Sequence, residues 1–123
     1  RQVAIVYGDG GFGLTGFDVE SYVRHGLPIV SIVGNNGAWN QTTQGVLKRT
    51  GRAIGTYLNQ EVDYAKIMDA MGGYGERVTD PDEIKPALDR AFTSGKAAVI
   101  DVVIDQEVGY GMMGGRSRQS RQY

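Results

Sequence analysis

Apolar residues gather in three short runs along the chain, separated by polar segments and by stretches with a helical period. The runs at residues 3–7, 29–33 and 97–104 are typical of strands that are buried on both faces of a parallel sheet. Residues 74–78 predict a further short strand. We therefore expect four strands, and we expect the first of them, at residues 3–7, to be fully buried.

Three helices are predicted between these strands. The first runs from about Thr15 to His25, with Thr15 as its N-cap and Gly26 as its C-terminal stop. Asp63 caps a second, short helix, whose apolar positions follow at i, i+3, i+4 and i+7: Tyr64, Ile67, Met68 and Met71. Residues 38–61 are polar with no clean period, which predicts a long loop with no more than one helical turn.

The third helix is predicted to begin near Asp80-Pro81. Pro86 has no N–H to donate inside that helix, so either the α-helix begins later or its first turn is kinked. The alternation of strands and helices predicts the α/β class, a parallel sheet with helices on both faces. We expect one domain over residues 1–105, followed by a Gly-, Ser- and Arg-rich tail over residues 106–123 that is either flexible or a lid on an active site.

Composition narrows the functional classes. The 123 residues include 13 Lys or Arg against 14 Asp or Glu, so nucleic-acid binding by bulk positive charge is excluded. The chain has no Cys, which excludes a disulfide framework and Cys-ligated zinc or iron–sulfur sites. No apolar run approaches the roughly 20 residues of a membrane span, and no signal-peptide pattern opens the chain. We therefore expect a cytoplasmic protein with a small-molecule substrate. Because the sequence opens directly in a predicted buried strand, we also expect the C-terminal part of a longer protein or one subunit of a split one.

A glycine-rich segment follows the first predicted strand. Gly8, Gly10 and Gly13 match the G-x-G-x-x-G pattern of dinucleotide sites, in which glycines let the backbone approach a phosphate and a helix N-terminus offers free N–H groups. Binding of NAD also requires an acidic residue at the end of the second strand. Asn35 and Asn36 stand there instead, which counts against a dinucleotide.

A second interpretation explains both strand ends together. Asp9 ends the first predicted strand and Asn36 ends the second, and the loops at the carboxyl ends of neighbouring parallel strands meet in one crevice. A carboxylate, a carboxamide and a main-chain carbonyl, most simply that of Ala38, are oxygen ligands suited to Mg²⁺. A cofactor diphosphate would then bind this metal and three backbone N–H groups, those of Gly10, Gly11 and Phe12. A structural glycine turn that binds nothing is the remaining alternative.

The tripeptide at residues 8–10, followed by a helix, a strand and the asparagine pair at residues 35–36, resembles a known cofactor motif. It is similar to the thiamine-diphosphate motif of the superfamily of acetolactate synthases, oxalyl-CoA decarboxylases and 2-hydroxyacyl-CoA lyases. The spacing between the two parts agrees with that motif, and the similarity continues through residues 15–20 and 26–29. Gly11 departs from it, because the family commonly has Ser or Ala there and a Ser hydroxyl contact to the diphosphate would be lost.

The resemblance implies the C-terminal, diphosphate-binding domain of such an enzyme, with thiamine diphosphate and Mg²⁺ as cofactors. It places the metal ligands at Asp9, Asn36 and Ala38. It places the cofactor contacts at seven positions: Gly8, Gly10, Gly11, Phe12, Asn36, Ala38 and Trp39. In this family the glutamate that activates the cofactor lies in a separate domain, usually contributed by another subunit. The resemblance therefore implies a carbon–carbon lyase in a homo- or hetero-oligomer, with the pyrimidine-binding domain in the same protein or in a companion chain.

Substrate preference divides the superfamily. The arginine-rich tail is expected to fold over the site, where its guanidinium groups would meet the phosphates of CoA. Candidate substrate contacts are Asn40, Tyr110, Met113, Arg116 and Arg118, the alternatives being ordinary packing for Asn40 and a solvated tail for the others. The favoured reaction is cleavage or formation of a 2-hydroxyacyl-CoA, from formyl-CoA and an aldehyde or ketone. The alternatives are an acetolactate synthase- or benzaldehyde lyase-like enzyme acting on free 2-keto acids or 2-hydroxy ketones, and a non-catalytic cofactor-binding remnant.

Overall fold

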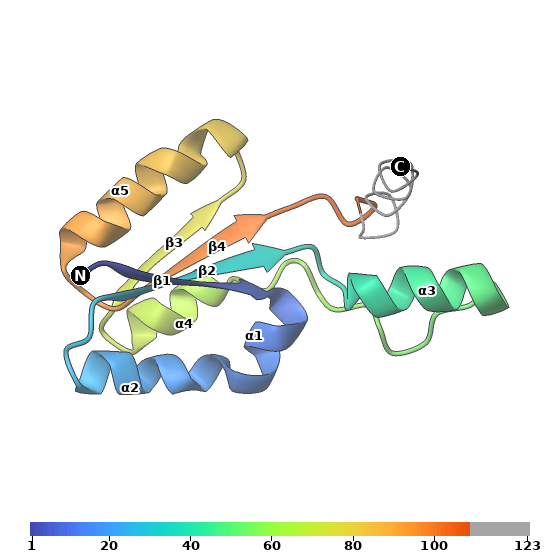
Figure 1. Cartoon of the computed structure of the whole chain (residues 1–123), viewed down its shortest axis with the longest axis horizontal. Helices are drawn as coiled ribbons and strands as arrows, with labels where there is room; N and C mark the ends of the chain where they lie inside the picture. Colours follow the sequence, from blue (N-terminus) through green and yellow to red (C-terminus); the bar gives the residue numbers. More distant parts are fainter. Residues whose placement is uncertain (109–123) are drawn as a thin grey trace, which may run out of the picture.

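The computed structural model describes residues 1–108, in which four parallel strands form a single sheet (Figure 1). The strands are β1 (Val3–Gly8), β2 (Ile29–Asn35), β3 (Tyr74–Val78) and β4 (Ala98–Val103), in the spatial order β1-β2-β4-β3. The helices are α1 (Asp9–Thr15), α2 (Val19–Arg24), α3 (Asn40–Thr50), α4 (Tyr64–Ala70) and α5 (Ile84–Ser94), with 3₁₀ turns at Gly16–Asp18 and Pro81–Glu83. All adjacent strands are parallel, which confirms the predicted α/β class.

Helices cover both faces of the sheet, as predicted. α1, α2 and α4 lie on one face and α5 on the other (Figure 1). Residues of β4 alternate between the two cores, because successive side chains of a strand point to opposite faces. Val99 packs in the core beneath α1, α2 and α4, whereas Ala98 and Ile100 pack against α5. Among residues 1–108, no helix combines the length and the apolar composition that a bilayer span requires.

The glycine-rich segment is helical, which corrects the prediction of a loop that leads to a helix at Thr15. α1 begins directly at Asp9 and Thr15 is its last residue; Thr15 precedes the 3₁₀ turn at Gly16–Asp18 but makes no side-chain capping hydrogen bond, and α2 begins only at Val19. Glycine has a low helix propensity, but the ring of Phe12 is buried and contacts Tyr7 and Tyr64 edge-on, at centroid distances of 5.5 and 5.4 Å. This tertiary packing outweighs the local preference of the glycines.

A second correction concerns residues 38–61, which were predicted to form a loop. α3 occupies Asn40–Thr50 and ends at Gly51, whose φ of +69° favours glycine. Only Asn40 and Thr43 of this helix are buried. α3 lies beyond the carboxyl ends of the strands rather than on a face of the sheet (Figure 1). It therefore needs no apolar stripe, and the sequence shows none.

The first strand is less buried than predicted. β1 lies at an edge of the sheet formed by the described residues, and Val3 and Val6 are 45% and 75% exposed. α5 packs against β3, β4 and β2, so Val6, on that side of the sheet, stays uncovered. An edge position leaves a strand partly open to solvent whatever its composition.

The remaining elements follow the predictions. α4 begins behind Asp63, whose carboxylate accepts the N–H groups of Ala65 and Lys66 at 3.1 and 3.3 Å. Pro81 lies in a 3₁₀ turn and α5 begins after it. Pro86 therefore falls in the first turn of α5, where a missing N–H costs no hydrogen bond within the helix.

Candidate functional site

The carboxyl ends of β1 and β2 lie side by side at one end of the sheet. Their register pairs Gly8 with Gly34, so Asp9 stands next to the turn that carries Asn36. A cavity of about 640 Å³ opens here, a volume in the usual range for ligand sites. Its lining includes most of the predicted site, namely residues 8–11 together with Asn36, Ala38, Trp39 and Asn40.

Asp9 and Asn36 converge on one backbone N–H. Asp9 is 2% exposed; its Oδ1 accepts the Gly10 N–H at 2.8 Å and its Oδ2 accepts the Ala38 N–H at 3.2 Å. Asn36 Oδ1 accepts the same Ala38 N–H, also at 3.2 Å. Side-chain oxygens from the ends of two neighbouring strands therefore lie beside one another at the Ala38 N–H.

Ala38 is held so that its own polar groups face this pair. It forms an isolated antiparallel bridge with Tyr57, in which the neighbouring residues make the two hydrogen bonds, at 2.8 and 2.7 Å. In such a pair the N–H and C=O of Ala38 both point away from Tyr57, toward the side on which Asp9 lies. No described residue donates a hydrogen bond to the Ala38 carbonyl, so that oxygen is available beside the Asp9 carboxylate.

Trp39 packs against the first turn of α1. A Cβ on Gly10 would lie 2.7 Å from the indole ring, so only glycine permits this contact. At Gly8 and Gly11, by contrast, nothing lies within 4 Å of a Cβ built there, and both positions border the cavity. The glycines of the motif thus differ in role: Gly10 admits the indole, and the other two leave the backbone open to a ligand.

Phe12 and Asn40, two of the predicted ligand contacts, already have hydrogen-bond partners within the protein. The Phe12 side chain belongs to the core, and helical geometry directs its N–H along α1 to the Gly8 carbonyl. Asn40 is 9% exposed, and its Nδ2 donates to the Gln106 carbonyl at 2.9 Å. Both residues already serve the fold, and contacts from them to a ligand stay predictions.

Two glutamines that the sequence pattern did not single out hold the turn after β2. Gln106 Nε2 donates to the carbonyls of Asn36 and Gly37 at 3.0 and 3.1 Å. Gln60 Nε2 donates to the Asn35 carbonyl at 3.1 Å. Both glutamines come from segments without any periodicity, so no signal in the sequence marks them.

A buried charge lies beneath this turn. The Asp101 side chain, in β4, is fully buried; its Oδ2 pairs with Arg77 Nη1 at 2.9 Å and accepts the Tyr64 N–H at 3.2 Å. Burial raises the pKa of Asp101, although hydrogen bonds from Asn35 and Tyr64 and the charge of Arg77 act to lower it. A single charged residue inside the apolar run at residues 97–104 is a signal that could have identified this position from the sequence.

Four of the predicted substrate contacts lie outside the described residues: Tyr110, Met113, Arg116 and Arg118. They therefore stay predictions, and so does the proposed domain boundary after residue 105.

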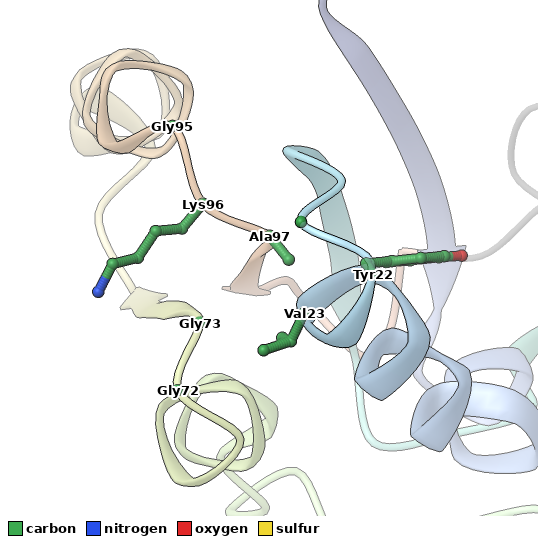
Figure 2. Close-up of a pocket in the computed structure, with 8 residues that line it drawn as sticks. Tyr22, Val23, Gly72, Gly73, Gly95, Lys96 and Ala97 are labelled. Carbon is green, nitrogen blue, oxygen red and sulfur yellow. The ribbon is translucent and has the colours of Figure 1, made fainter.

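A second, smaller cavity of about 170 Å³ lies at the opposite end of the sheet, where the turns before β3 and β4 meet the end of α2 (Figure 2). The side chains of Val23 and Ala97 and several glycines form its walls. Figure 2 shows the Lys96 ammonium and the Tyr22 hydroxyl pointing in opposite directions, away from the space between them. Polar groups do not converge in this cavity, which favours the larger one as the functional site.

Residues 1–102 match the family described as "Thiamine pyrophosphate enzyme, C-terminal TPP binding domain". The acetolactate synthase large subunit of Mycobacterium tuberculosis is 40% identical over 110 residues and the 2-hydroxyacyl-CoA lyase of Oryza sativa 40% identical over 114 residues; each alignment covers 89% of this chain and 20% of the relative. The crystal structure of benzoylformate decarboxylase from Polynucleobacter necessarius superposes with a TM-score of 0.80 at 26% identity, over 88% of this chain and 20% of that chain. The chain thus spans about one fifth of the length of these proteins. The predicted motif lies at the carboxyl ends of β1 and β2, and the chain belongs to the family of C-terminal TPP-binding domains of thiamine pyrophosphate enzymes.

Proposed function

We propose that this chain holds the diphosphate of thiamine diphosphate through one Mg²⁺, with Asp9, Asn36 and the Ala38 carbonyl as its protein ligands. The observation that carries the proposal is the convergence of Asp9 Oδ2 and Asn36 Oδ1 on a single N–H, each at 3.2 Å. Membership of the TPP-binding family supports the choice of cofactor.

The residues present fit such a metal. The Asp9 carboxylate is buried, and none of the ion pairs among residues 1–108 involves it. A buried carboxylate without a cationic partner is costly, and a divalent cation would offset that cost. Mg²⁺ prefers oxygen ligands, keeps several waters and binds the phosphates of its ligand, so a carboxylate, a carboxamide and a carbonyl suffice as its protein ligands.

The first turn of α1 offers the diphosphate a backbone surface. The Gly11 N–H is among the first N–H groups of the helix, which have no acceptor within it. The Gly10 N–H already donates to Asp9 Oδ1 at 2.8 Å, so it orients the carboxylate. Gly8 and Gly11 carry no side chain that would keep phosphate oxygens at a distance. The Trp39 indole, packed on Gly10, closes one side of this surface.

We further propose that the complete enzyme is a carbon–carbon lyase. When bound, thiamine diphosphate supplies the nucleophilic carbon and the electron sink for cleavage of a bond next to a carbonyl. This chain holds the diphosphate end, and Trp39 and Asn40 line the cavity in which a substrate would lie. The activating glutamate comes, in this proposal, from a separate domain or a companion chain, so this chain alone should be inactive.

The proposed substrate is a 2-hydroxyacyl-CoA, cleaved to formyl-CoA and an aldehyde or ketone. A second candidate, carboligation or decarboxylation of free 2-keto acids, has equal support, because the 2-hydroxyacyl-CoA lyase and the acetolactate synthase relatives are both 40% identical to this chain. Assays of the complete enzyme with a 2-hydroxyacyl-CoA and with pyruvate decide between them. Turnover of pyruvate alone would overturn the CoA assignment.

Replacing Asp9 tests the metal site. In the complete enzyme, Asp9→Asn keeps the shape of the side chain but removes its charge, so we expect thiamine diphosphate with Mg²⁺ to bind at least roughly 100-fold more weakly. Isothermal titration calorimetry with and without EDTA measures this affinity. Asp18→Asn, at an exposed position of the same segment, is the matched control and should bind as the wild type does. Equal binding by the wild type in EDTA and in Mg²⁺ would overturn the metal assignment.

A further inference from the structure

Gln106 bonds to both sides of the turn between β2 and α3. It stands after β4, beyond the family match, which ends at residue 102. Its Nε2 donates to two consecutive carbonyls, those of Asn36 at 3.0 Å and Gly37 at 3.1 Å. The main-chain carbonyl of Gln106 accepts a hydrogen bond from Asn40 Nδ2 at 2.9 Å, and Asn40 is the first residue of α3. A single residue outside the matched segment therefore holds the turn that carries the proposed ligands.

The turn is shaped to receive this side chain. Gly37 has a φ of +64°, and a Cβ there would lie 3.1 Å from Gln106 Nε2 and 2.8 Å from Gln60 Cβ. Glycine at this position allows both glutamines to close on the turn. The hydrogen bonds from Gln106 are partly buried, so water replaces them less readily than it would at an exposed site.

These hydrogen bonds hold the backbone that carries the proposed ligand atoms, without involving those atoms themselves. Fixing the Asn36 carbonyl restricts the backbone rotation that would swing Asn36 Oδ1 away from the Ala38 N–H, which it accepts at 3.2 Å. Asp9 Oδ2 reaches the same N–H from α1. If the turn shifted, Asn36 and Ala38 would move together relative to Asp9, and the three oxygens would no longer share one centre.

We propose that Gln106 is a positioning residue, which keeps the turn from Asn36 to Ala38 in the geometry of a metal ligand without itself contacting the metal or the cofactor. This role rests on the proposed function, since it takes Asn36 and the Ala38 carbonyl as ligands. Groups that orient metal ligands commonly change the metal affinity by about 10- to 100-fold when they are removed.

The test compares two leucine variants of the complete enzyme. Gln106→Leu removes both donated hydrogen bonds with little change in volume. Gln60→Leu is the matched control, because Gln60 also donates to two backbone carbonyls, those of Asn35 at 3.1 Å and Ile104 at 2.8 Å, neither of which belongs to a proposed ligand. A purely structural role for Gln106 predicts equal effects of the two substitutions, whereas positioning predicts a strong loss of metal affinity in Gln106→Leu alone.

Mn²⁺ is the probe, and free Mn²⁺ is measured by electron paramagnetic resonance in the presence of saturating thiamine diphosphate. We expect the dissociation constant of Mn²⁺ to rise about tenfold or more in Gln106→Leu and much less in Gln60→Leu. At saturating metal, kcat of Gln106→Leu should return close to the wild-type value. Gln106→Glu keeps the shape but places a carboxylate against two carbonyls, so it should also weaken Mn²⁺ binding, and it supplies the test if Gln106→Leu does not fold.

Equal rises in the two leucine variants, or unchanged Mn²⁺ binding in the Gln106 variants, would overturn the positioning role. A wild-type enzyme that binds no Mn²⁺ in response to thiamine diphosphate would instead overturn the proposed function. The two failures are therefore distinguishable in one set of titrations.

Discussion

Asp9 is buried in the first turn of α1, where each of its oxygens accepts one backbone N–H. Carboxylates near the start of a helix are stabilised by the unpaired N–H groups there, and here the two hydrogen bonds also fix the direction in which the charge points. The position of Asp9 at the end of a strand was predictable from local sequence. Its contact with the Ala38 N–H was not, because that contact joins residues from two separate strand ends.

Gly10→Ala is expected to disturb the same turn, because the new Cβ would lie 2.7 Å from the Trp39 indole. Either the indole leaves α1 or the backbone shifts, at a cost of about 1–3 kcal/mol. Gly11→Ala is the control, since nothing lies within 4 Å of a Cβ at that position and alanine favours a helix over glycine by about 1 kcal/mol. Urea unfolding of the complete apoenzyme should show the first variant destabilised and the second not. The opposite order would contradict the packing of Trp39 on Gly10.

At the scale of elements, Asp101 connects three strands and a helix. It lies in β4, pairs with Arg77 of β3, accepts the first N–H of α4 from Tyr64, and lies 3.5 Å from the Asn35 side chain of β2. Burial raises its pKa despite these partners. Through Asn35, the residue before Asn36, this network also reaches the strand end that carries the proposed site.

This raised pKa predicts how stability depends on pH. The folded state binds the Asp101 proton more tightly than the unfolded chain does, so its contribution to stability is largest below the ordinary pKa of 3.8 and is lost as pH rises through the raised value. Asp101→Asn removes this titration but keeps an oxygen that can accept the Tyr64 N–H. We expect the free energy of unfolding of the variant, relative to the wild type, to improve as pH rises above 3.8. Urea midpoints over a pH series measure this difference, and a difference independent of pH would contradict the raised pKa.

The helices show why some elements were predictable and others were not. α4 and α5 were predicted because each places an apolar stripe against the sheet and follows a polar cap: Asp63 caps α4 itself, and Asp80 caps the 3₁₀ turn that leads into α5. α1 was missed because the burial of Phe12 overrides the low helix propensity of the glycines. α3 was missed because a helix beyond the end of the sheet buries only two of its residues, Asn40 and Thr43.

At the scale of the whole molecule, the two ends of the sheet have different surfaces. At the carboxyl end, Asp9, Asn36 and Asn40 line one large cavity, whereas at the amino end glycine turns surround a small one. The molecule also has an open edge, because β1 lies at one side of the sheet formed by the described residues. Val6, on the uncovered side of β1, is 75% exposed, and such edges tend to pair with other chains.

We therefore expect the isolated 123-residue chain to self-associate as its concentration rises. Val6→Lys should reduce this association, because a charge beside an open edge opposes strand pairing. Val108→Lys makes the same substitution at a position that is 58% exposed and lies outside the edge strand, and it should leave the association unchanged. Sedimentation velocity measures all three proteins. Association that is unaffected by Val6→Lys would show that the edge is not responsible.

Local patterns were sufficient for the α/β class, the four parallel strands and the cofactor motif at residues 8–10 and 35–36, because apolar runs and the polar residues at strand ends are properties of neighbouring positions. Contacts between distant positions decided the rest: the helical form of the glycine segment, the existence of α3, the exposed edge of β1 and the support of the Asn36 turn. Gln106 and Asn36 are 70 positions apart, and only the folded sheet brings them within hydrogen-bonding distance. No pattern of neighbouring residues encodes such a pair, because its geometry arises only when the strands have assembled.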